Sequence, residues 1–426
     1  MRTLRSWARD TAGGLPVTFW YLWLGTLINR LGGFVIIFLT IYLTTVRDFS
    51  PSQAGLIVGL WAAGGAAGNM IGGVAADRLG RKVTLLSCQV VSAAVLLAMA
   101  FVTNYWTLAG FALLLGLSAD GARPAFWAMM IDIVPERDRL RAFNLNYWAI
   151  NVGFAVAAIL AGVAAEADYH LIFIVDAATT LLAFVFLLFT IPETRLLAAA
   201  EIRVPAGSVG APAGGLREVF ADRTFVLYAA LNILVAFVFL QHLTTLPIAM
   251  AADDISARTY GSVIGLNGVL IVVGQLFIPK LVRGLNRSHM LAAAAVIMGI
   301  GFGLTAYADT PVFYAVTVLV WTIGEMINAP ANSTLLAELS PAALRGRYQG
   351  VFSLSWSIAG FGAPIVGGYI QENAGNSSLW LACAGIGVIV AVAQVLAGPA
   401  REQRTRALKV PAAEARVAEA AGAVGS

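Results

Sequence analysis

The chain has 426 residues, of which 59% are hydrophobic and 12% are charged, and its mean hydropathy is +0.81. Soluble globular proteins carry about 25% charged residues, so this composition excludes an ordinary soluble protein and indicates a chain that lies in a lipid bilayer. The net charge of +4 and the pI near 9.2 are therefore interpreted through the distribution of charge along the chain, not as a sign of nucleic-acid binding.

Twelve apolar runs are long enough to cross a bilayer, since about 20 apolar residues span its hydrocarbon core. The first run is too long for a signal-peptide core and lacks a small-residue cleavage site, so we expect it to remain as a spanning helix. The sequence thus predicts an all-α membrane protein with twelve transmembrane helices. The runs cover residues 17–46, 52–76, 83–103, 106–134, 142–166, 169–191, 223–251, 259–282, 288–308, 311–339, 346–372 and 376–398.

The runs fall into two groups of six, which predicts two helical bundles. The predicted units are an N-terminal bundle (1–191), a cytoplasmic linker (192–222), a C-terminal bundle (223–398) and a disordered cytoplasmic tail (399–426). The linker is rich in proline and glycine, which favour loops, and a short amphipathic helix is expected near Leu216–Phe220. The tail is rich in alanine with scattered charge, which is typical of a solvated extension.

Positive charges are concentrated in alternate loops. Nearly all of the 27 Lys and Arg residues lie on the side of the N-terminus, whereas the opposite loops hold only Arg47 and Arg258. Since positively charged loops stay in the cytoplasm, both termini are predicted to be cytoplasmic, in a multi-pass protein of the inner (cytoplasmic) membrane. Cys88 and Cys383 lie in separate predicted helices and indicate neither a disulfide nor a metal site.

A charged, glycine-containing turn separates the second and third apolar runs. It resembles the signature G-x-L-a-D-R-x-G-R-K, found between the second and third helices of major facilitator superfamily transporters, and departs from it only at Ala75. The resemblance implies two six-helix bundles, each built from two three-helix repeats, that rock to give alternating access. The turn reads Gly73-Val74-Ala75-Ala76-Asp77-Arg78-Leu79-Gly80-Arg81-Lys82.

The resemblance also implies a conformational latch at this turn. In relatives the aspartate at the position of Asp77 meets the start of helix eleven when the outer side is open, where helix N–H groups stabilise a carboxylate. The arginine at the position of Arg81 pairs with an acid at the inner end of helix four, for which Asp132 is well placed. Positive charge that merely keeps the loop inside is the alternative, but it does not require Asp77. The candidate latch residues are Gly73, which would permit close helix contact, Asp77, Arg78, Gly80, Arg81, Lys82 and Asp132.

Five ionisable residues fall within the predicted helices, where a charge is costly and marks a functional site by default. In this superfamily, helices one, four, seven and ten line the central cavity, and four of the five residues lie on helices one, four and ten. The fifth, on helix six, lies nearer the outer face. The five residues are Arg30, Asp120, Arg123, Asp176 and Glu325.

Glu325 is the predicted proton-coupling residue, ahead of Asp120. Glu325 has no cation near it in the sequence, and burial without a cation favours the neutral form of a carboxyl group. Asp120 and Arg123 are three residues apart on one helix face and can pair. Two alternatives stay open for Glu325: a fixed ion pair with Arg30, or direct binding of a cationic substrate.

Six polar residues are candidates for the substrate cavity. Interhelical hydrogen bonding is the alternative for the asparagines. His242 is a candidate proton relay, with a satisfied polar group near the outer mouth as its alternative. The six candidates are Arg30, Arg123, Asn29, Gln241, His242 and Asn328.

No P-loop, nucleophile elbow or metal-ligand cluster occurs in the sequence, so no catalytic residue, cofactor or bound metal is expected. The pattern is closest to the drug:proton antiporter (multidrug efflux) branch, although its proline-containing signature has a match on helix eleven, at Gly360–Gly368, and not on helix five. The resemblance implies a monomeric secondary transporter that exports a small amphipathic molecule in exchange for protons. Its partners would be that substrate, protons and the lipid bilayer, and no nucleic acid. Proton-coupled uptake, lipid translocation and a non-transporting receptor or scaffold are the alternatives.

Overall fold

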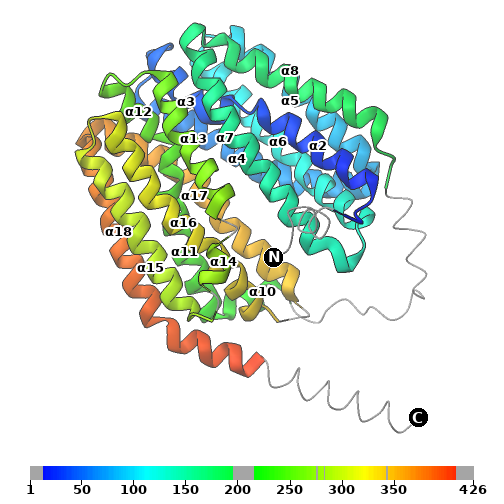
Figure 1. The fold of residues 1–426 in the computed structure, drawn as a ribbon, viewed down its shortest axis with the longest axis vertical. Coiled ribbons are helices and arrows are strands. Elements are labelled where there is room, and N and C mark those ends of the chain that lie inside the picture. Colours follow the sequence, from blue (N-terminus) through cyan, green and yellow to red (C-terminus); the bar gives the residue numbers. More distant parts are fainter. Residues whose placement is uncertain (1–12, 195–214, 275–276, 283, 342–343, 409–426) are drawn as a thin grey trace, which may run out of the picture.

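The computed structural model describes residues 13–194, 215–274, 277–282, 284–341 and 344–408, and these residues form helices and no strand. Two helical bundles follow each other along the chain and lie side by side (Figure 1). The first contains α2 (Val17–Leu31), α3 (Val35–Thr45), α4 (Pro51–Leu79), α5 (Arg81–Phe101), α6 (Tyr105–Ile133), α7 (Arg139–Ala167) and α8 (His170–Thr190). The second contains α11 (Arg223–Thr244), α12 (Leu246–Ala252), α13 (Ala257–Gly274), α14 (Ile278–Leu281), α15 (Arg287–Leu304), α16 (Pro311–Leu339), α17 (Arg345–Ala374) and α18 (Asn376–Leu396). The predicted all-α class with twelve helices in two bundles is confirmed.

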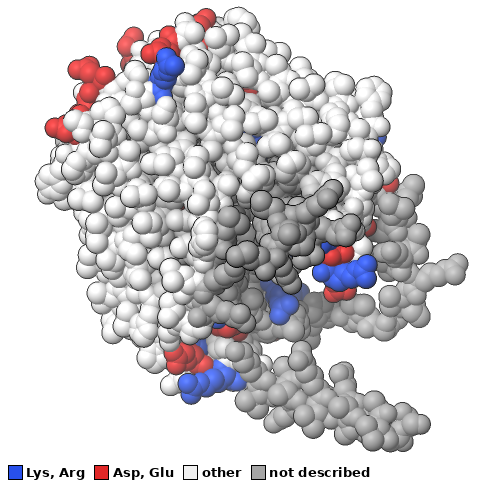
Figure 2. Space-filling view, in the orientation of Figure 1, with Lys and Arg blue, Asp and Glu red and all other residues white. Residues whose placement is uncertain are grey.

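Eleven helices of the described part of the chain are long and apolar enough to cross a membrane. The helix of the predicted twelve that falls outside this group is α6, which contains Asp120, Arg123 and Asp132. On the face drawn in Figure 2, charged side chains gather at the two ends of the molecule and the surface between them is mostly uncharged. This arrangement suits a bilayer, since the hydrocarbon core excludes charged groups.

The first predicted helix is broken in the structure. The run 17–46 forms α2 and α3, which are separated at Gly32 and Gly33. A Cβ atom at Gly32 would overlap the side chain of Thr179 on α8, so glycine is required for the close approach of the two segments. The carboxylate of Asp176, also on α8, accepts a hydrogen bond of 3.1 Å from the backbone N–H of Val35 at the start of α3. The break between α2 and α3 is therefore stabilised by contacts with α8.

The bundles contact each other at the end opposite the charged turn. Here α4 packs on α17 through Gly55, where a Cβ would overlap the carbonyl oxygen of Pro364, and α7 packs on α13 through Gly261 in the same way. The backbone N–H of Ser52 donates a hydrogen bond of 3.0 Å to Glu372 across the interface. In Figure 1 the bundles meet near α3, α12 and α13, and their other ends lie apart. Among the described residues, the close contacts between α4 and α17 and between α7 and α13 thus join the bundles at this end.

A methyl group at Gly55 tests whether this closed end is one of two alternating states. Gly55→Ala is expected to force α4 away from Pro364 and to shift the protein toward a form that is open at this end. Spin-label distances across the α4–α17 interface should lengthen. Gly362→Ala is the matched control on α17, because a Cβ at Gly362 meets no atom within 4 Å. Equal distances in the Gly55 variant and the control would contradict the expectation.

The chain after α18 departs from the predicted disordered tail. Residues 398–408 are helical, and Arg401 is buried with its guanidinium 5.5 Å from the ring centre of Tyr228. Burial lowers the pKa of Arg401 to about 10, so it stays cationic at neutral pH. Arg404 forms an ion pair of 3.1 Å with Asp222 beside α11. These contacts fix the helix to the second bundle, which alanine content alone did not reveal.

The expected amphipathic helix of the linker is present as α10 (Leu216–Ala221). The remainder of the predicted linker (195–214) and of the predicted tail (409–426) lies outside the described residues.

Candidate functional site

A cavity of about 410 Å³ lies inside the first bundle. It is enclosed mainly by α2, α5, α6 and α8, with further contributions from α3, α4 and α7. Its volume is in the range of small-molecule sites, which hold roughly 300–1,000 Å³. In the described part of the chain, all residues that line it belong to the first bundle. This location differs from the sequence-based expectation of a site shared by helices one, four, seven and ten.

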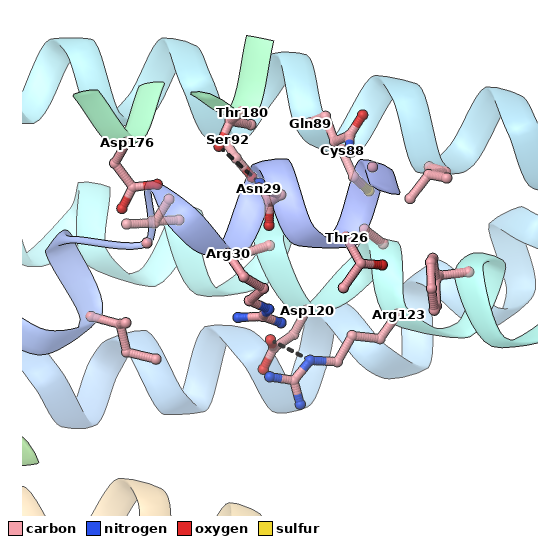
Figure 3. Close-up of a pocket in the computed structure, with 18 of the residues that line it drawn as sticks. Thr26, Asn29, Arg30, Cys88, Gln89, Ser92, Asp120, Arg123, Asp176 and Thr180 are labelled. Atoms are coloured by element: carbon pink, nitrogen blue, oxygen red, sulfur yellow. Dashed lines mark hydrogen bonds and ion pairs between the residues drawn. The ribbon is translucent and has the colours of Figure 1, made fainter. Parts of the chain in front are cut away.

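Three of the five charged residues predicted within the helices meet in the cavity, and of these the side chain of Arg123 is 50% exposed and that of Asp120 28% exposed. Asp120 and Arg123 on α6 form the expected ion pair, with 3.0 Å between Nε and the carboxylate. Arg30 on α2 lies beside them, and Figure 3 shows its guanidinium directed toward the carboxylate of Asp120. Among the described residues, however, the guanidinium of Arg30 has no hydrogen bond or ion pair. The cavity thus contains one paired and one unpaired guanidinium.

Asp176 also lines the cavity, at the end near α3 (Figure 3). The sequence placed it apart from the other charges because it lies on the sixth spanning helix. The break after α2 brings the N-terminus of α3 to its carboxylate, which accepts the N–H of Val35. A helix N-terminus stabilises an anion, so Asp176 is held at α3 and does not pair with Arg30. The glycine pair at the break was the signal in the sequence that could have identified this contact.

Polar and aromatic side chains complete the cavity wall. Asn29 donates a hydrogen bond of 3.1 Å to Thr180, which joins α2 to α8. Trp61, Phe126 and Trp127 provide apolar surface. The cavity can therefore accept a ligand with both a charged group and an apolar body.

Glu325 lies outside this cavity, on α16 of the second bundle. Its carboxylate accepts a hydrogen bond of 2.8 Å from the amide of Asn267 on α13, and the same amide donates to Thr322 at 3.1 Å. Within the described residues Glu325 forms no ion pair. The fixed pair with Arg30, one of the alternatives left open by the sequence, is therefore not formed in this structure.

The three remaining cavity candidates belong to contacts inside the second bundle. Gln241 is fully buried and donates to the carbonyl oxygen of Ala363 on α17, at 3.2 Å. His242 is 2.6 Å from the carbonyl oxygen of Phe239, and Asn328 accepts a hydrogen bond of 3.3 Å from Asn332. None of the three lines the cavity in the first bundle, so their role in substrate binding stays a prediction.

The charged turn between α4 and α5 contacts the end of α6 and the segment that follows α8. Arg81, the first residue of α5, forms an ion pair with Asp132 near the end of α6. Glu193, which follows α8, accepts the backbone N–H groups of Arg81 and Lys82, each at 3.0 Å. Gly80 has a φ of +107°, and a Cβ there would lie 2.7 Å from the Glu193 carboxylate. Glycine at this position thus allows Glu193, in the segment after α8, to cap the start of α5.

The other latch candidates lie at the end of α4 and at the start of α5. Asp77 is exposed near the end of α4 and forms no hydrogen bond or ion pair among the described residues. A Cβ at Gly73 would lie 3.9 Å from Pro124, which is ordinary spacing, whereas one at Gly72 would overlap the carbonyl oxygen of Gly121. The close helix contact expected at Gly73 is therefore made one residue earlier. Arg78 lies exposed on the same last turn of α4, and Lys82 donates to the carbonyl oxygen of Leu188 at 2.8 Å.

Comparison with known proteins identifies the same family that the charged turn resembles. The profile of the Major Facilitator Superfamily matches residues 22–364 and 242–424, which is most of the chain. The chain belongs to the major facilitator superfamily. As a member of this superfamily it is a multi-pass membrane transporter and not an enzyme.

Several transporters of the superfamily are similar over most of their length. An uncharacterized MFS-type transporter of Bacillus subtilis, YttB, is 27% identical over 372 residues, 86% of this chain and 91% of the relative. A Na(+), Li(+), K(+)/H(+) antiporter of Planococcus maritimus is 23% identical, with coverages of 77% and 83%. The multidrug resistance protein MdtH of Salmonella arizonae is 24% identical, with coverages of 71% and 73%. The crystal structure of the nucleoside transporter NupG has the same fold, with a TM-score of 0.76 and 17% identity over 89% of this chain and 98% of that one.

Proposed function

We propose that this secondary transporter moves a small amphipathic molecule across the cytoplasmic membrane by proton-coupled efflux. The observation that carries the proposal is the cavity of the first bundle, where Arg30, Asp120 and Arg123 meet beside aromatic side chains. Charged groups in a bilayer are costly, so a protein retains them where they act on a ligand or an ion. A non-transporting scaffold has no use for such groups.

Alternating access follows from the arrangement of the bundles. The closed contacts through Gly55 and Gly261 hold one end together, while the ends that carry the charged turn lie apart. With both termini in the cytoplasm, as the charge distribution predicts, the end joined through Gly55 and Gly261 would face away from the cytoplasm. Asp77, whose side chain has no hydrogen bond or ion pair among the described residues, would then meet the start of α17 when the bundles close on that side. The latch role of the turn is part of this proposal.

Proton coupling is assigned to Glu325, with Asp120 as the second candidate. Glu325 is held by Asn267 without a cation among the described residues, so its carboxyl group can gain and lose a proton without breaking an ion pair. Asp120 forms an ion pair with Arg123, which must break when Asp120 takes up a proton, so Asp120 is the poorer proton carrier. An antiporter that exchanges cations for protons and a multidrug resistance protein are among the relatives, which supports exchange and efflux for this chain.

Flux in proteoliposomes tests the proposal against uptake and against a scaffold. We expect an imposed pH gradient to drive movement of an amphipathic probe, either ethidium as a cation or naphthalene-2-sulfonate as an anion, in the direction opposite to the protons. Movement with the protons would support uptake instead. Equal flux in protein-free vesicles would support the scaffold, and scrambling of labelled phospholipids without probe movement would support lipid translocation.

A further inference from the structure

The guanidinium of Arg30 lies in the cavity and forms no ion pair with any described residue. Two acids and one further cation face it: Asp120, Asp176 and Arg123. Asp120 forms an ion pair of 3.0 Å with Arg123, and Asp176 accepts a hydrogen bond from the backbone N–H of Val35 at the N-terminus of α3. Each acid therefore already has a partner. An arginine offers five N–H donors in a planar fork that fits the oxygens of an anion, and here these donors have no acceptor among the described residues.

A second polar group in the cavity also lacks a partner. Asn146 on α7 is 1% exposed and lines the cavity, and neither atom of its amide has a hydrogen bond among the described residues. Buried polar groups are nearly always hydrogen-bonded, so an unpartnered amide next to a cavity requires an explanation. A bound ligand with polar atoms supplies one.

From these observations we propose that the cavity binds amphipathic organic anions, whose carboxylate, sulfonate or phosphate oxygens contact Arg30. The apolar part of the ligand would lie against Trp61, Phe126 and Trp127. A cation is disfavoured at the same place, because the acids that would attract it already have partners, whereas Arg30 repels it. This inference rests on the proposed transport function and names the substrate class of its site.

Ligands that differ only in charge test the proposal on the purified full-length protein. Naphthalene-2-sulfonate is a permanent anion, naphthalene-2-sulfonamide is neutral, and 2-naphthyltrimethylammonium is a permanent cation. Direct binding to the unsubstituted protein is expected to favour the sulfonate by at least about tenfold, since a hydrogen bond to a charged group contributes about 1.5–3 kcal/mol. Equal or tighter binding of the cation would overturn the proposal, and so would the absence of sulfonate binding at millimolar concentration.

Substitution of Arg30 tests whether this residue causes the preference for the anionic ligand. Arg30→Gln should remove the preference for the sulfonate and leave binding of the sulfonamide within about threefold, because the apolar contacts remain. Arg30→Lys keeps the charge and should keep a preference for the anion, which also guards against misfolding of the glutamine variant. Arg137→Gln, at an exposed position in the short 3-10 helix Glu136–Asp138, is the matched control and should bind as the unsubstituted protein does. A preference that survives in Arg30→Gln would contradict the assignment to Arg30.

The flux experiment separates this inference from the transport function. Flux of ethidium without binding of the sulfonate would retain the transporter and reject the anion site. Sulfonate binding that depends on Arg30, without flux of either probe, would retain the anion site and reject coupled transport.

Discussion

Replacement of Glu325 by glutamine is expected to abolish transport that an imposed pH gradient drives, to the level of protein-free vesicles. Glutamine has the size of glutamate, and its amide oxygen can accept the hydrogen bond from Asn267, so the packing of α13 on α16 should survive. It cannot exchange a proton, so coupling is lost while the binding site, which lies in the other bundle, is unchanged. Flux under a pH gradient and probe binding in detergent should therefore respond differently.

Glu338→Gln is the control for this substitution. Glu338 lies on the same helix, α16, and forms no hydrogen bond or ion pair among the described residues. It should support coupled flux at the unsubstituted level. Gradient-driven flux that persists in Glu325→Gln would refute the assignment and would make Asp120 the next residue to test.

Removal of the charge at Asp132 is expected to lower stability more than removal of the charge at Asp77. The side chains of Asp132 and Arg81 are only 8% and 16% exposed, so Asp132→Asn leaves a largely buried guanidinium without its counter-ion. Loss of one partner of a buried pair costs about 3–5 kcal/mol, and partial exposure places this pair near the lower limit. The apparent melting temperature in detergent should fall by several degrees.

Asp77→Asn makes the same chemical change four residues before Arg81. Because Asp77 is exposed and has no partner among the described residues, its replacement should change stability by less than about 0.5 kcal/mol and leave the melting temperature nearly unchanged. Equal melting temperatures for the two variants would show that the Arg81–Asp132 pair does not stabilise this state. Loss of transport in Asp77→Asn at unchanged stability would support its role in the opposite state of the cycle.

Several features of the two bundles can be predicted from the sequence. Each spanning helix is identified by its own run of apolar residues, and the charged turn by ten consecutive residues, so both were predictable from local information. The pairs Asp120–Arg123 and Arg81–Asp132 were also anticipated, the first from helical spacing and the second from resemblance to relatives. The break between α2 and α3 was missed, since Gly32 and Gly33 do not interrupt a run that remains apolar overall.

The all-α membrane class and the two six-helix halves follow from composition and residue order, because each apolar run and each cluster of positive charge is a local property of the sequence. The three-dimensional packing was needed to show that Asp176 shares a cavity with Arg30, that Glu325 accepts a hydrogen bond from Asn267, and that Glu193 caps α5. These contacts join residues far apart in sequence. They depend on how each helix is rotated and how closely glycines let it approach its neighbour, which no single helix specifies.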